Sequence, residues 1–311
     1  MSALADAVAS PTRRTVVRWA WASVVANSVI ILTGGAVRLT ASGLGCPTWP
    51  RCTDESFTPH SALGAHGVIE FGNRMLTYVL VAIAIGTWVA VLRSTSKGDR
   101  SRLVATLLLL GIPAQGLLGG VTVLTDLNPW IVALHLMLSM ALVAGSTLLL
   151  SRVAGWRADA VPVGARRLVA ATWTVLWVVL YLGTVVTGSG PHAGDVDAPR
   201  NGLDPATWSH VHAFSVYVLV GLTVLSAWSL RRAGAAVASR AALVLLGVEL
   251  AQGLVGFVQY FTDLPIVLVW LHLLGASLLA AFATRLLLLT GTPHPAAPAA
   301  PRPDAATTAS R

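Results

Sequence analysis

Apolar residues form long, unbroken stretches along this chain, and polar or turn-forming residues separate them. Eight stretches are long enough to cross the hydrocarbon core of a bilayer, which takes roughly 20 residues of helix. They lie at about 15–37, 67–92, 103–124, 129–151, 167–187, 206–230, 240–261 and 265–290. A lone strand could not satisfy its backbone in lipid, and the alternating segments of a membrane barrel are absent. The pattern therefore predicts an all-α, polytopic membrane protein with eight transmembrane helices.

Composition and charge agree with this prediction. Of 311 residues, 55% are hydrophobic and 11% are charged, whereas soluble chains carry about 25% charged residues. The net charge is +8, but basic residues precede the first stretch and follow the second, fourth and sixth, while acidic residues gather in the other loops. The positive-inside rule then predicts a multi-pass protein of the cell membrane with both termini in the cytoplasm. The basic excess marks topology, so no nucleic-acid partner is predicted.

An internal repeat divides the chain into two halves. The sequence AQGL at 114–117 recurs 137 residues later at 251–254, and YVLV at 78–81 recurs 139 residues later at 217–220. Each half has four spans, an even number, so both have the same orientation and form two four-helix bundles. The predicted parts are a cytoplasmic N-terminal segment (1–14), an N-terminal half (15–151), a cytoplasmic linker (152–166), a C-terminal half (167–290) and a disordered cytoplasmic tail (291–311).

Histidines within the spans are candidates for function, because ionisable residues are costly inside a bilayer. His135 and His272 are equivalent under the 137-residue repeat, and the 139-residue repeat pairs Asn73 with His212. The second half thus offers His212 and His272 on two helices at the same depth. Two neutral imidazoles facing each other suit the axial positions of haem iron. The alternatives are hydrogen bonds to neighbouring helices, or zinc, which usually takes three or four ligands.

The first half differs, because Asn73, a poor iron ligand, lies at the position that partners His135. Such a site could leave one face of an iron open or hold a haem that comes and goes. Glu70 shares a helical face with Asn73, where it either interacts with the helix N-terminus or transfers protons beside a reactive centre. His66, one turn before Glu70, either replaces the missing ligand or lies at the wet interface.

The two cysteines, Cys46 and Cys52, lie together in the first loop on the non-cytoplasmic side. Outside the cytoplasm such a pair can oxidise to a disulfide, which would hold the loop over the mouth of the bundle. A redox role is the alternative. Within the spans, Gln115 and Gln252 are expected to make helix-packing contacts.

Taken together, these residues resemble the haem A synthase family over nearly the whole chain, and most of all its bacterial, actinobacterial-like members. The resemblance rests on the loop that contains Cys46 and Cys52, here called the cysteine loop, and on TGGAVR at 33–38, EFGNR at 70–74, residues 187–195 and the spans of His135 and His272. It implies an eight-helix oxidoreductase that oxidises a methyl group of haem O to the formyl group of haem A. Two successive hydroxylations would give a geminal diol, which loses water to form the aldehyde.

The resemblance also implies roles for individual residues. His212 and His272 would ligate haem B in the C-terminal half, while His135 and Glu70 would belong to the catalytic site, with His135 binding the iron of the substrate haem O. Many family members have a histidine where this chain has Asn73, so the second ligand of the substrate iron is open.

The remaining implications concern neighbouring residues and partners. Arg74 would join Asn73 among the cofactor-binding residues, and Cys46 and Cys52 would form the family's disulfide. A haem O synthase and the assembly of terminal oxidases are the implied partners. The sequence identifies neither the electron donor nor the oxygen source, and it is compatible with a homo-oligomer.

Two other functions compete with this one. A b-type membrane cytochrome that relays electrons to or from quinone would explain His212 and His272 but not Glu70 or the asymmetric first half. A transporter would also have two repeated halves, and it predicts polar or broken helices near the bilayer midplane. The polar residues of this chain are instead expected to cluster towards the non-cytoplasmic side.

Overall fold

The structure, a computed structural model, describes residues 11–290 of the chain. Within that range its elements are α2 (Arg13–Leu39), η1 (Ser61–Leu63), α3 (Gly64–Ser94), α4 (Arg100–Leu124), α5 (Pro129–Ala154), α6 (Val163–Ser189), α7 (Pro205–Arg232), α8 (Ala236–Phe261) and α9 (Ile266–Leu289). All eight α-helices of this range are long and apolar enough to cross a membrane. The predicted all-α class with eight spans is confirmed. The predicted tail, 291–311, and residues 1–10 lie outside the described residues.

Side chains on the outside of the helices are apolar. Leu117 is 59% exposed, Leu254 66% and Phe261 76%. In a membrane these side chains would contact lipid, so their exposure in the isolated chain carries no hydrophobic cost there.

Polar caps decide where several helices begin and end. The side chain of Asn128 accepts a hydrogen bond from a first-turn N–H group of α5, and Asp204 does the same for α7. Proline follows each cap, as Pro129 and Pro205, because the first helical position needs no N–H donor. At the other end of α5, Gly155 ends the helix in the left-handed conformation with φ of +64°, which costs glycine little.

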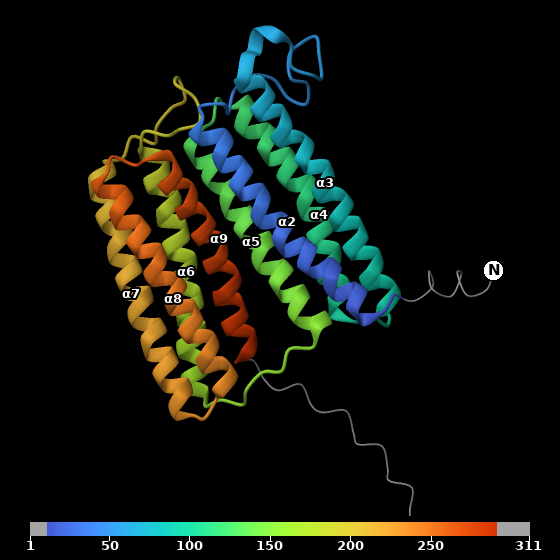
Figure 1. The fold of residues 1–311 in the computed structure, drawn as a ribbon, viewed down its shortest axis with the longest axis vertical. Coiled ribbons are helices and arrows are strands. Elements are labelled where there is room, and N and C mark those ends of the chain that lie inside the picture. The colour runs from blue at the N-terminus through green and yellow to red at the C-terminus, as the bar shows by residue number, and fades with distance from the viewer. Residues whose placement is uncertain (1–10, 291–311) are drawn as a thin grey trace, which may run out of the picture.

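The helices form two rings of four (Figure 1). In the first ring α2, α3, α4 and α5 each contact the next helix, and α5 closes the ring on α2. In the second ring α6 to α9 follow the same order, and α9 closes on α6. As a result α3 and α5 oppose each other across the first ring, and α7 and α9 oppose each other across the second.

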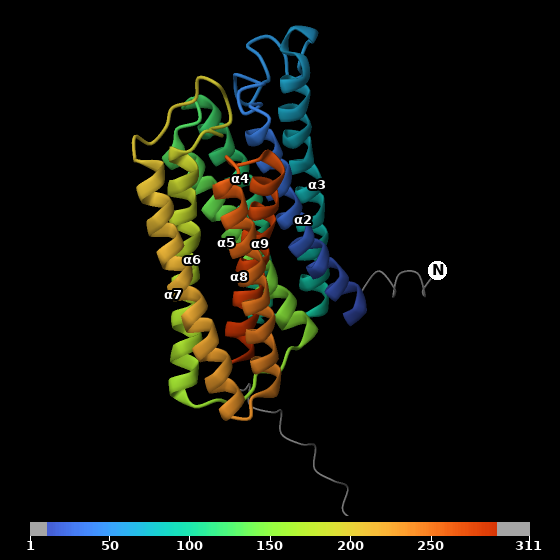
Figure 2. The same ribbon diagram turned by 60° about the vertical axis from the view of Figure 1, so that its left-hand side comes forward.

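The two rings pack side by side through α2 and α5 of the first ring and α9 and α6 of the second (Figures 1 and 2). The indole Nε1 of Trp270 donates to the carbonyl oxygen of Leu32 at 2.8 Å. Gly35 lies under Leu273, since a Cβ atom at Gly35 would be 2.4 Å from Leu273 Cδ2. A small residue on α2 therefore allows close approach of α9.

The two ends of the molecule differ. One end, here called the loop end, carries loops 40–63 and 190–204. The other, the linker end, carries linker 155–162, the start of α2 and the end of α9 (Figure 1).

Candidate functional site

Two histidines of the second ring lie on its opposite helices. His212 lies seven residues from the loop end of α7, and His272 lies six residues from the loop end of α9. At 1.5 Å of rise per residue, both are roughly 10 Å from the ends of their helices. The structure thus brings together, at one depth, the pair that the repeat singled out.

Each of these imidazoles lies against a glycine of the preceding helix. A Cβ atom at Gly183 of α6 would lie 3.2 Å from His212 Cε1, and one at Gly256 of α8 would lie 3.2 Å from His272 Cε1. The Nδ1 atoms of both histidines are buried and have no hydrogen-bond partner. Buried polar atoms normally have a hydrogen-bond partner. These imidazoles are therefore suited to bind a group that is not part of the protein.

The donor set fits haem better than a bare metal ion. No group of three or more His, Cys, Asp and Glu side chains within residues 11–290 could hold a metal ion, so the zinc alternative finds no support in this part of the chain. Haem iron takes four ligands from its porphyrin and needs only the two axial ones from protein. His212 and His272 can supply both.

The first ring repeats the arrangement with one imidazole fewer. His135 of α5 lies against Gly119 of α4, where a Cβ atom would be 3.2 Å from its Cε1, and its Nδ1 is buried without a partner. On the opposite helix, α3, the buried Oδ1 of Asn73 also lacks a partner. His66 is exposed, and its Nδ1 lies 2.9 Å from Ser42 Oγ. The structure therefore places His66 at the rim of the ring, where the interfacial interpretation put it.

Two equivalent glutamines fix the backbone of two of these histidines. Gln115 Nε2 donates to the carbonyl oxygen of His135 at 3.0 Å, and Gln252 Nε2 donates to that of His272 at 2.6 Å. The predicted helix-packing contacts are confirmed. The glycine that makes room for the same imidazole follows each glutamine by four residues. That spacing is about one helical turn and puts both residues on one face of the helix. The helix that precedes each histidine thus binds the histidine backbone through its glutamine and leaves space for the imidazole at its glycine.

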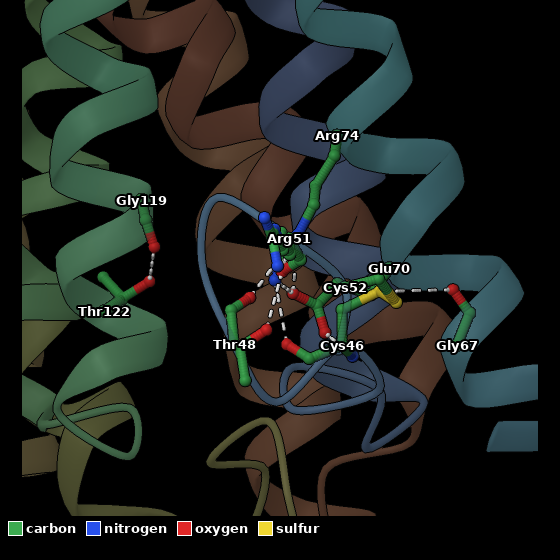
Figure 3. Close-up of polar contacts among 9 residues, drawn as sticks. All are labelled: Cys46, Thr48, Arg51, Cys52, Gly67, Glu70, Arg74, Gly119 and Thr122. Atoms are coloured by element: carbon green, nitrogen blue, oxygen red, sulfur yellow. Dashed lines mark hydrogen bonds and ion pairs between the residues drawn. A yellow bond between two sulfur atoms is a disulfide. The ribbon is translucent and has the colours of Figure 1, made fainter. Parts of the chain in front are cut away.

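The cysteine loop is tied to α3. Cys46 and Cys52 form a disulfide with an S–S distance of 2.05 Å. Glu70 is buried at 5% exposure, and its Oε2 accepts a hydrogen bond from the Cys46 N–H at 2.6 Å (Figure 3). Its Oε1 accepts from Arg74 Nη2 at 2.6 Å and forms an ion pair. Both carboxylate oxygens therefore have partners, and the carboxylate bonds to the loop instead of the N-terminus of its own helix.

Arg74 holds the same loop by its carbonyl groups. Its Nη1 donates to Thr48 O at 3.0 Å and to Arg51 O at 3.1 Å, and its Nη2 donates to Cys46 O at 2.9 Å (Figure 3). A planar guanidinium with several fixed donors suits such a cluster of acceptors. In this structure Arg74 is a loop anchor, and its predicted role toward a cofactor stays a prediction.

Trp49, in the cysteine loop, belongs to this region although sequence reasoning missed it. A Cβ atom at Gly120 would lie 2.4 Å from Trp49 Cδ2, so the indole lies on the α4 backbone. The preceding residue, Gly119, faces His135. The loop therefore brings an aromatic ring to the turn of α4 that holds His135. The available signal was a tryptophan among prolines between two cysteines.

A second missed residue is Glu249, which lies near the middle of α8 and is 2% exposed. The expectation that polar residues gather towards the non-cytoplasmic side is wrong here. The signal was present as a single acidic residue inside an apolar stretch, which is rare without function.

Two stretches that carried the family resemblance contact each other across the rings. Arg38, at the end of α2, donates to Thr187 O at 2.8 Å and to His192 O at 2.5 Å. His192 Nε2 lies 3.0 Å from Leu264 O. Residues 33–38 and 187–195 therefore join the two rings at the loop end.

Comparisons with known proteins agree with this arrangement. The family described as "Cytochrome oxidase assembly protein" (COX15-CtaA) matches residues 17–66 and 63–284. A "Heme A synthase" from Bradyrhizobium sp. (strain ORS 278) is 28% identical over 88% of this chain and 91% of its own length. One from Rhizobium etli (strain CIAT 652) is 26% identical over 87% and 88%. One from Halalkalibacterium halodurans is 29% identical over 51% and 54%. The family match extends across both rings.

Proposed function

The chain belongs to the COX15-CtaA family of cytochrome oxidase assembly proteins, and from this premise we propose that it is a haem A synthase. This oxidoreductase oxidises a methyl group of haem O to the formyl group of haem A by two hydroxylations and the loss of water. The observation that carries the proposal is a packing arrangement around an imidazole that occurs three times. His135, His212 and His272 each lie against a glycine of the preceding helix with a buried, unpartnered Nδ1.

The second ring is proposed to hold haem B between His212 and His272. The opposite positions of α7 and α9 and the equal depth of the two histidines support this assignment. When bound, haem B supplies one-electron transfer. Gly183 and Gly256 leave space for the imidazoles, and Gln252 fixes the backbone of His272.

The first ring is proposed to bind the substrate, haem O. His135 would bind its iron. On the opposite helix, α3, Asn73 offers only a carboxamide, which is not a strong ligand for iron. Such a one-histidine site suits a haem that must enter and leave. Trp49 covers the α4 turn beside His135 and limits access of water from the loop end.

Glu70 is proposed as the proton-transfer group of the first ring. It is the acidic residue of α3 and lies three residues before Asn73. Its hydrogen bonds to Cys46 N and Arg74 hold the carboxylate in place. Its Oε2 atom accepts a single hydrogen bond and has a further lone pair that can bind a proton. Protonation would weaken the hydrogen bonds to Cys46 and Arg74, so catalysis and the position of the loop would be linked.

The setting of the enzyme is also a proposal. Basic residues are concentrated at the linker end, so the positive-inside rule puts that end in the cytoplasm of a bacterial cell. Haem O would come from a haem O synthase, and haem A would pass to a terminal oxidase.

The test is to express the chain with a source of haem O in cells that lack haem A, and to separate the extracted haems by chromatography. The wild type should yield haem A or its hydroxylated precursor. His135→Ala should yield neither while retaining haem B, and His60→Ala, at an exposed loop position, should behave as the wild type. Recovery of only haem B and unchanged haem O from the wild type would favour the b-type cytochrome instead. Full activity of His135→Ala would refute the catalytic assignment.

A further inference from the structure

A buried polar row crosses the second ring on the linker side of the histidines, and the proposed function does not use it. Its innermost member is Glu249 of α8. The Oε1 atom of Glu249 lies 2.8 Å from Thr223 Oγ1 of α7. Its Oε2 atom is buried without a partner. A carboxyl group with an unpaired oxygen is costly inside a bilayer, so it requires a reason.

Thr223 can satisfy Glu249 in either protonation state. The Thr223 hydroxyl, with 0% exposure, lies within reach of Glu249 Oε1 and also 3.1 Å from the carbonyl oxygen of Leu219. A hydroxyl has one hydrogen and can accept through its lone pairs. It donates to a Glu249 carboxylate, or it donates to Leu219 and accepts from a Glu249 carboxylic acid. The pair therefore has two hydrogen-bond arrangements that differ by one proton, and in both of them Oε2 has no partner.

The row continues toward the linker end. Ser226 lies one turn from Thr223 on α7, is 0% exposed, and its Oγ is 3.0 Å from Thr172 Oγ1 of α6. Ser226 is six residues from the end of α7 at Arg232, or roughly 9 Å along the helix. Three buried hydroxyl groups, those of Thr172, Ser226 and Thr223, thus lie between the linker end and Glu249 at the middle of α8.

The first ring lacks the Glu249–Thr223 pair of this row, although the 139-residue repeat places a buried Thr87 where the second ring has Ser226. The 137-residue repeat places Ile112 where the second ring has Glu249, and the 139-residue repeat places Ala84 where it has Thr223. Both Ile112 and Ala84 are buried and apolar. The polar pair therefore belongs to the half proposed to hold haem B, and general packing of this fold does not require it.

Other charged groups do not neutralise Glu249. The helices packed against α8 are α7 and α9. On these three helices the other titratable or charged side chains are His210, His212, Tyr217, Arg231, Arg232, Arg240, Tyr260, His272 and Arg285. None of them forms a hydrogen bond or an ion pair with the Glu249 carboxyl group.

We propose that Glu249 is a redox-linked proton acceptor, loaded from the linker end through Thr172, Ser226 and Thr223. The inference rests on the proposed haem B site. With haem B held by His212 and His272, one electron from a membrane quinol would reduce its ferric iron to ferrous, and one proton from water at the linker end would convert the Glu249 carboxylate to the acid. Oxidation of the iron reverses both changes. The proton offsets the added negative charge, whose cost is large at low dielectric constant.

The test is a redox titration of haem B in the purified full-length protein at several pH values. One proton taken up per electron lowers the midpoint potential by about 59 mV per pH unit, the equivalent of a tenfold change in proton concentration. The wild type should approach this slope. Glu249→Gln should keep the haem B spectrum and lose most of the slope. Ser277→Ala, which removes another fully buried hydroxyl group, should keep the wild-type slope.

A wild-type slope in Glu249→Gln, or a wild-type potential independent of pH, would overturn the inference. Difference infrared spectroscopy gives a second readout, because the carboxylic acid band of Glu249 should appear on reduction and be missing in Glu249→Gln. Haem A production with a pH-independent potential would refute the proton acceptor and leave the proposed function intact. A chain that binds no haem B would refute the cofactor site and, with it, the redox-linked proton acceptor.

Discussion

At the scale of single residues, glycine explains where the imidazoles can lie. Glycine inside a helix costs about 0.5–1 kcal/mol relative to alanine, so its presence needs a reason. At Gly119, Gly183 and Gly256 the reason is a histidine ring in contact from the next helix. A larger residue would push that ring away from the interior of its bundle.

Gly256→Ala should therefore lower the haem B content of the purified protein severalfold. The added Cβ atom would lie 3.2 Å from His272 Cε1, so the imidazole must move or tilt to relieve the contact. Gly247→Ala is the matched control, because it lies on the same helix and a Cβ atom there would meet nothing within 4 Å. It should keep haem B and match or exceed wild-type stability. Haem B would be measured by absorbance per unit of protein, and equal contents in the two variants would contradict the prediction.

The sequence predicted part of this region and missed the rest for physical reasons. Histidines in apolar stretches are conspicuous, and the repeat paired them. Glu249 was not predicted as a functional residue, because its equivalent in the first half is Ile112 and a search for repeated polar residues does not find it. Trp49 escaped because its contact with Gly120 joins a loop to a distant helix, and no periodic pattern records such a contact.

At the scale of elements, the cysteine loop depends on α3 as much as on its own disulfide. The disulfide closes only a short ring, whereas Arg74 contacts three carbonyl groups within that ring, those of Cys46, Thr48 and Arg51. Hydrogen bonds to charged groups contribute about 1.5–3 kcal/mol. The loop should therefore become mobile when the guanidinium is lost, even with the disulfide intact.

Arg74→Gln should speed hydrogen–deuterium exchange of amides 46–52 by roughly tenfold or more, since about 1.4 kcal/mol corresponds to a factor of ten. The substitution removes donors to the loop and leaves the Glu70 carboxylate without its ion pair. Arg100→Gln, at an exposed position of the linker end, should leave exchange in the loop unchanged. The measurement is mass spectrometry of the peptic peptides that contain the loop. Equal exchange in both variants would show that the loop does not depend on the Arg74 guanidinium.

Helix boundaries were predicted well because the membrane fixes the apolar length. The helices nevertheless extend beyond the apolar stretches. The stretch at about 240–261 corresponds to Ala236–Phe261, and the one at about 15–37 corresponds to Arg13–Leu39. At the start of α2 the end is set by a cap, because the Thr12 side chain accepts a hydrogen bond from the Thr15 N–H, and hydropathy does not record a cap.

At the scale of the whole molecule, the repeat predicts two bundles but not how they meet. The repeat treats α5 and α9 as equivalents, and the structure packs them against each other. It also places α2 beside α9, a contact between the first and last helices of residues 11–290. Docking depends on local shape, such as Gly35 under Leu273 and the bond from Trp270 to Leu32. These features leave no periodic signal in the sequence.

Because each ring is closed on itself, the two halves should assemble even when the linker is cut. Co-expressed chains 1–157 and 158–311, with an affinity tag on one, should co-purify from detergent. Gly35→Phe should abolish co-purification, because a Cβ atom there would lie 2.4 Å from Leu273 Cδ2. Adding volume at such a close contact destabilises the packing of the two helices. Gly34→Phe is the neighbouring control, since a Cβ atom there would meet nothing within 4 Å. If both variants co-purify equally, the ring interface does not depend on the α2–α9 contact, and the packing of α5 against α6 and α9, together with the bonds of Arg38, is sufficient to hold the halves together.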